Sequence, residues 1–330
     1  MGTPFARSRL RNTQHTQHSG LLAAKRMIAE TLTLILFLTL FATVVAAVSL
    51  IAPATCYAQP WKVDLDASLM LTQTSYTDNW AGGEAGSLAW AFNSNFLTEK
   101  QLNPKMLSKN TLRLAFGQTH SQDKETKHWA RPAKSTDLVD FESALNLTLG
   151  GFVDPFVSGR VETQFFDNTD PQKNRYLNPA TFTEALGITK DLIKREKRTW
   201  SARLGAGFRQ HLNREALNSV TEKRETEASN DGGIEFVSDF TSPLAQEHLE
   251  LTSELVVFEA FYFSKANSIR GLPYASYWKA PDIRWDNTFK ASITKYVMVS
   301  LYTQFLYDKE IDLGGRFKQT LSLGLTYKLK

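Results

Sequence analysis

The chain is almost without cysteine: Cys56 is the only one in 330 residues. It lies within residues 1–58, which we expect to be removed on export. A mature chain that begins at residue 59 then has neither a disulfide nor a thiol nucleophile. Its stability must therefore come from other interactions.

Long apolar runs are also scarce. The only one, residues 32–52, follows a lead with five basic residues. Small residues precede a cleavage point after Ala58, so residues 1–58 have the layout of a secretory signal peptide. Two alternatives stay open, a retained inner-membrane anchor and a lipoprotein signal at Cys56. Residues 59–330 contain no apolar stretch near the length of about 18 residues that a membrane-spanning helix needs.

The mature chain also has no excess of positive or negative charge. Residues 1–58 hold five of the 38 basic residues and one of the 34 acidic residues, which leaves 33 of each in the mature chain. The formal net charge of +4 thus belongs to the leader. Nothing in this balance indicates a nucleic-acid partner.

What the mature chain does have is alternation. In residues 317–328, apolar side chains such as Phe317, Leu321 and Leu325 take odd positions, and polar ones such as Lys318 and Thr326 take even positions. Successive side chains of a strand point to opposite faces, so this pattern predicts one apolar and one polar face. We count twelve such segments, at roughly 61–73, 86–98, 109–119, 136–149, 153–166, 180–190, 199–212, 233–241, 247–263, 282–295, 297–308 and 315–329.

The connections between these segments differ in length. Long polar connections are expected at 120–135, 167–179, 213–232 and 264–281, and short ones at 150–152, 241–246 and 296. Short periplasmic turns and longer outer loops are typical of transmembrane barrels. We therefore predict an all-β fold, a single antiparallel outer-membrane barrel of about 12 strands over residues 59–330. A soluble β-sandwich or soluble barrel is the alternative.

Charged side chains recur on the polar face of the predicted strands. The candidates to line the lumen are Arg160, Glu162, Arg203, Arg209, Glu250, Glu254, Arg284, Asp286 and Lys290. These residues either line a narrow polar passage or pair with one another and fill the lumen. Twelve strands lie between the filled barrels of about eight strands and the open ones of about sixteen, so both readings stay open.

Two shorter features stand out. Residues 77–86 read TDNWAGGEAG, and we expect Trp80, Gly82, Gly83 and Glu84 to form a turn at the outer mouth, or else to contact a ligand or plug the lumen there. A basic run follows the sixth segment and either binds anionic phospholipid headgroups or forms a solvated periplasmic turn. Its members are Lys190, Lys194, Arg195, Lys197 and Arg198.

Several blocks match a known family in order along the chain. They are Gln73 with Tyr76 and Asn79–Gly83, Leu177–Ala180 with Leu186–Ile188, Phe305–Asp308, and Phe317–Lys328. With these blocks the chain resembles a bacterial outer-membrane β-barrel family of unknown function. The resemblance implies an outer-membrane barrel and no established activity.

Catalytic and metal motifs are not evident. Histidines 120, 128, 211 and 248 show no ligand spacing, and no G-x-S-x-G is present. We expect no enzymatic activity, metal or cofactor.

The expected partners are outer-membrane lipid, the barrel-assembly machinery during biogenesis and small polar solutes. The leading hypothesis is a narrow channel or binding barrel for such solutes. The alternatives are a structural or assembly barrel with a closed lumen and an outer-membrane enzyme.

Overall fold

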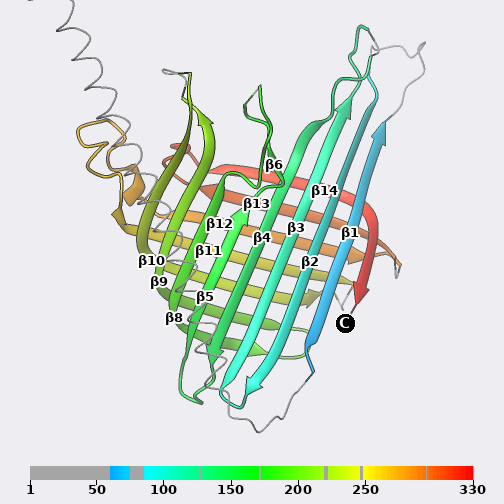
Figure 1. Cartoon of the computed structure of the whole chain (residues 1–330). Helices are drawn as coiled ribbons and strands as arrows, with labels where there is room; N and C mark the ends of the chain where they lie inside the picture. Colours follow the sequence, from blue (N-terminus) through cyan, green and yellow to red (C-terminus); the bar gives the residue numbers. More distant parts are fainter. Residues whose placement is uncertain are drawn as a thin grey trace, which may run out of the picture. The chain divides into compact units, whose positions relative to one another are not determined.

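Twelve strands close into one antiparallel barrel in the computed structural model (Figure 1). The structure describes residues 60–74, 85–126, 128–170, 172–218, 222–245, 248–294 and 296–329. The barrel strands are β1 (Lys62–Thr74), β2 (Ser87–Asn103), β3 (Met106–Ser121), β4 (Ala133–Leu147), β5 (Asp154–Thr163), β8 (Ala180–Lys194), β9 (Thr199–Leu217), β10 (Arg224–Leu244), β11 (Leu249–Phe263), β12 (Asp282–Ser292), β13 (Val297–Tyr307) and β14 (Arg316–Leu329). This confirms the predicted fold class and strand number.

Each strand pairs with its neighbour along the chain, with one interruption. Between β5 and β8, the short strands β6 (Phe166–Asp167) and β7 (Arg175–Tyr176) form a separate two-stranded sheet. The barrel closes where β1 pairs with β14 over six residue pairs, against thirteen between β1 and β2. This closing seam is the shortest of the barrel ladders among the described residues.

The outer face of the barrel is apolar, as the alternation predicts. On β14, Phe317, Leu321, Leu323 and Leu325 are 55 to 67 % exposed. A soluble protein would bury such a face, whereas a transmembrane barrel turns it to lipid hydrocarbon. The soluble alternatives are therefore not supported.

The two ends of the barrel differ. Short turns at 104–105, 148–153, 195–198, 245–248 and 293–296 occupy the end at which β1 begins and β14 ends. The other end carries the connections at 122–132, 164–179, 264–281 and 308–315. We assign the short-turn end to the periplasm and the other to the outside.

The prediction of a long loop at 213–232 is wrong. Strands β9 and β10 continue to Leu217 and from Arg224, so only residues 218–223 connect them. Pairing of Arg224 with Leu217 and of Asn230 with Gln210 extends the ladder through the polar segment. A polar sequence can form a hairpin where both of its faces are in water.

Two expectations fall outside the described residues: the signal peptide at 1–58 and the mouth motif of Trp80, Gly82, Gly83 and Glu84. Among the described residues, no helix is long and apolar enough to cross a membrane. The 3₁₀ segment η2 (Tyr277–Lys279) lies in the connection between β11 and β12.

Candidate functional site

Charged side chains from opposite walls meet inside the barrel. Six of them form what we call the lumen ring: Arg113, Asp140, Arg160, Glu162, Glu254 and Arg284. They come from β3, β4, β5, β11 and β12. Alternation places them on the inward face, which is opposite to the lipid-facing side chains.

One ion pair of the lumen ring spans the full width of the barrel. Nη2 of Arg113 on β3 lies 2.5 Å from Oε2 of Glu254 on β11. In the strand order, β3 and β11 are six steps apart in either direction, so the two residues stand on diametrically opposed strands. A direct contact between them means that the walls approach to side-chain reach at this level.

The remaining contacts close the lumen ring. Arg284 donates to Glu254 and to Glu162, both at 2.8 Å. Arg160 bonds Glu162 at 2.9 Å and holds Asp140 with two nitrogens, at 2.7 and 2.8 Å. Oδ2 of Asp140 lies 3.4 Å from Nη1 of Arg113, which completes the lumen ring.

Positive and negative groups thus alternate around the lumen ring, with three of each. Every carboxylate lies between two guanidinium groups, which offsets the cost of moving charge out of bulk water. Burial is uneven: the side chain of Asp140 is 4 % exposed, whereas those of Arg113 and Glu162 are 33 and 42 % exposed. The more exposed members keep the lumen ring in contact with solvent inside the barrel.

The other predicted lumen residues lie in separate clusters. Arg203 bridges from β9 to Glu142 on β4 at 2.5 Å. Arg209 binds Asp231 at 2.8 Å and Asp282 at 2.7 Å, which joins β9, β10 and β12.

A further cluster lies between β12 and the closing seam. Lys290 pairs with Asp66 of β1, and Glu250 stands opposite Lys290 in the β11–β12 register. Asp286 accepts hydrogen bonds from Tyr302 at 2.6 Å and Gln304 at 2.8 Å. The structure thus gives every predicted lumen residue an inward position, while their role in a passage stays a prediction.

Sequence reasoning missed three acidic partners: Asp140, Asp231 and Asp282. Asp140 has the same strand phase as Glu142, so alternation alone could have found it. The polar sequence of residues 213–232 predicts a loop and therefore gives no inward position for Asp231, which the structure places on β10. There it also accepts from the ring of His211, which lies 3.1 Å away and contacts Thr181 on its other nitrogen.

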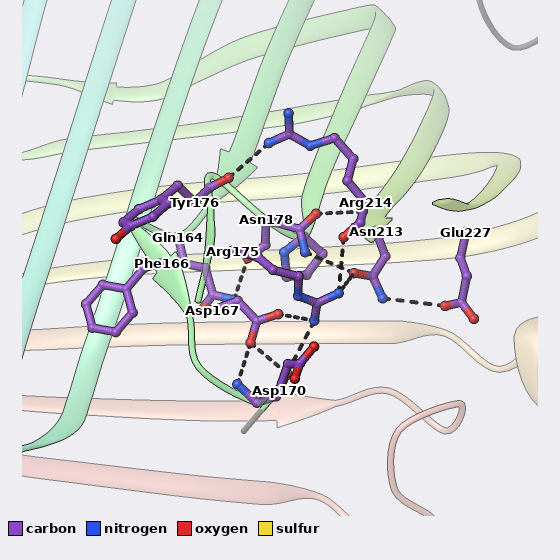
Figure 2. Close-up of polar contacts among 12 residues, drawn as sticks. Gln164, Phe166, Asp167, Asp170, Arg175, Tyr176, Asn178, Asn213, Arg214 and Glu227 are labelled. Atoms are coloured by element: carbon purple, nitrogen blue, oxygen red, sulfur yellow. Dashed lines mark hydrogen bonds and ion pairs between the residues drawn. The ribbon is translucent and has the colours of Figure 1, made fainter. Parts of the chain in front are cut away.

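The connection between β5 and β8 is an ordered structure rather than the plain loop that its sequence suggests (Figure 2). We call residues 164–179 the outer latch. Within it, the guanidinium of Arg175 binds the carboxylate of Asp167, and both side chains are buried. The same guanidinium donates to Asn213 of β9 at 2.9 Å.

Further bonds anchor the outer latch to three barrel strands. Asn178 accepts from the backbone N–H of Arg214 on β9 at 2.7 Å (Figure 2). Lys134 on β4 donates to Gln164 at 2.7 Å, and Arg224 on β10 binds Asp170. The outer latch therefore joins β4 to β9 and β10 at the outer end of the barrel.

Comparison with known proteins gives one family match and several solved barrels of low similarity. A family described as a protein of unknown function, DUF3078, matches residues 71–168. The barrel lies in the outer membrane. This conclusion rests on the closed strand ladder and its apolar outer face, and the family match confirms the resemblance over the matched segment. No curated protein matches the sequence.

Several solved structures resemble the barrel at low identity. An outer-membrane channel from Pseudomonas putida F1 is 14 % identical and has a TM-score of 0.37, with 84 % of this chain and 98 % of that chain covered. The translocator domain of the autotransporter NalP from Neisseria meningitidis is 8 % identical with a TM-score of 0.33, covering 89 and 96 %. OmpF of Salmonella typhi is 10 % identical with a TM-score of 0.25, covering 82 and 97 %.

Proposed function

We propose that this outer-membrane barrel is a narrow passage for small polar solutes, which the lumen ring holds closed at rest. The observation that carries the proposal is the diametric pair Arg113–Glu254. It places a bonded pair of charges across the lumen, where a solute would have to pass.

The chemistry of the lumen ring supports a passage that can open. Its contacts are made by long side chains, which can exchange partners without a change in the strand ladder. Arg113 and Glu162 are partly exposed, so water is available to replace a broken ion pair. Because positive and negative groups are equal in number, we expect weak selectivity between cations and anions.

The second candidate is a barrel with a purely structural or assembly role. The same ion pairs would favour this role if they never separate, because the lumen would then stay closed. We propose no enzymatic role for the barrel.

Single-channel recording in planar bilayers distinguishes the two candidates. The double variant Arg113→Ala with Glu254→Ala removes the diametric pair and leaves the lumen ring neutral. We expect wild-type protein to be closed for most of the recording and the double variant to show frequent conductance steps.

A matched control removes a pair at the outer end. Lys173→Ala with Glu215→Ala also deletes one positive and one negative group, but this pair is exposed and joins the outer latch to β9. It should record like wild type. Permanent large conductance of wild type contradicts a closed resting state, and silence of the folded double variant favours the structural role.

A further inference from the structure

We propose that the outer face of β9 to β12 binds one anionic phospholipid of the periplasmic leaflet. Its phosphate lies at Arg198, and part of one acyl chain lies in a groove between Trp200 and Trp285. This site is independent of the lumen and of the proposed passage.

The groove is a hollow of about 310 Å³ in the lipid-facing surface. Its lining residues are Trp200, Ser238, Phe240, Ser253, Leu255 and Trp285. Trp200 and Trp285 are 40 and 48 % exposed, which places their rings on the outside of the barrel. A volume near the low end of the range of about 300 to 1,000 Å³ for small-molecule sites suits a segment of an acyl chain.

The two serines explain both the hollow and its apolar character. A hydroxyl facing hydrocarbon lacks the hydrogen bonds that water would supply, which costs free energy. Here the indole Nε1 of Trp200 donates to Ser238 and that of Trp285 donates to Ser253, each at 3.0 Å. The hydroxyls are thereby satisfied, and their small size leaves open space between the two rings.

A guanidinium lies at the periplasmic end of the same face. Trp200 pairs with Phe240 and Thr199 with Thr241, so Arg198 shares the outward phase of Trp200. Its Nε donates to Ser242 at 2.9 Å. In the described part of the chain, no carboxylate lies within salt-bridge distance of Arg198. Guanidinium groups make paired contacts with phosphate, which suits the terminal nitrogens of Arg198 to a phospholipid headgroup.

The surroundings of Arg198 favour an anionic headgroup. Arg195 and Arg198 close the β8–β9 turn through a backbone hydrogen bond of 2.9 Å, and both side chains are exposed. Residues 194–198 hold four basic groups and one acidic group. Each basic residue near an anionic surface adds to the attraction. Trp200 stands next to this turn, at the headgroup level that indole rings prefer.

Native mass spectrometry of the detergent-solubilised full barrel with added phosphatidylglycerol tests the site. We expect wild type to retain one phosphatidylglycerol at concentrations at which phosphatidylcholine is lost. Arg198→Gln should reduce this retention at least fivefold. Ser238→Leu, which fills the groove without changing charge, should do the same.

The control is Arg270→Gln, which removes one positive charge from the connection at the outer end, where Arg270 donates to Asn267. It should bind phosphatidylglycerol like wild type. Equal retention by the two arginine variants would overturn the phosphate site, and unchanged retention by Ser238→Leu would overturn the acyl groove. Equal retention of phosphatidylcholine would overturn the preference for an anionic headgroup. Heat-modifiable migration on a gel verifies that each variant is folded.

Discussion

Single charged residues fasten the outer latch, and Asp170, which lies outside the membrane-spanning strands, is one of them. Its carboxylate accepts a hydrogen bond from Arg224 and another from the backbone N–H of Gln172. These bonds lower the pKa of Asp170 from 3.8 to about 2. Since the charged form is bound in the folded state, the bond to Arg224 is complete above about pH 4 and weakens as the pH falls toward 2.

Pepsin, which is active in this pH range, reports the change. We expect cleavage within residues 164–179 of wild type to be slow at pH 4 and to rise as the pH approaches 2. Asp170→Asn lacks the ionised partner, so it should already be cleaved quickly at pH 4. Equal cleavage of the two proteins at pH 4 would contradict a role for this pair.

Alternation identified individual residues where it was unbroken. The sequence pattern predicts an inward position for Arg160, Glu162 and Arg284, and all three belong to the lumen ring. The partner of each could not be predicted, because Arg284 and Glu162 are 122 residues apart in the chain. Such pairs depend on barrel diameter and strand register, which a sequence pattern leaves open.

At the scale of elements, the contact between β8 and β9 depends on two facing glycines. Gly187 pairs with Gly205, and a Cβ on Gly187 would lie 2.2 Å from the carbonyl oxygen of Leu204. The two strands therefore approach more closely than side chains would permit.

Gly187→Val should force these strands apart and destabilise the barrel by about 1 to 3 kcal/mol, the usual cost of overpacking. The midpoint of heat-modifiable migration should fall by several degrees. Gly151→Ala is the control, because a Cβ there meets its nearest atom at 3.6 Å, in the β4–β5 turn. A Gly187→Val barrel as stable as this control would show that the close approach is dispensable.

Elements with one face in lipid were predictable, and elements outside the membrane were not. Alternation is clear in β14, where only Gln319 interrupts the apolar row, because hydrocarbon and lumen impose opposite demands on successive residues. The outer ends of β9 and β10 have polar groups on both faces, so the sequence shows no alternation there. The hairpin β6–β7 depends on Asn213 and Lys134, which belong to other strands.

At the scale of the whole molecule, the difference between the two ends of the barrel predicts which end faces the outside of the cell. Ser268 lies exposed in the connection at 264–281, and Gly151 lies exposed in a short turn at the opposite end. In intact cells, a membrane-impermeant maleimide should label Ser268→Cys and leave Gly151→Cys unlabelled until the outer membrane is permeabilised. The reverse pattern would contradict the assigned orientation.

The closing seam has a consequence for how the molecule is made. With six residue pairs between β1 and β14, it is the shortest ladder of the barrel in the part of the chain that the structure describes. A nascent barrel can therefore pair its other strands first and still expose two free edges, to which another protein can add a strand by backbone hydrogen bonds. We therefore expect this seam to be the last ladder to form and the first to separate under force.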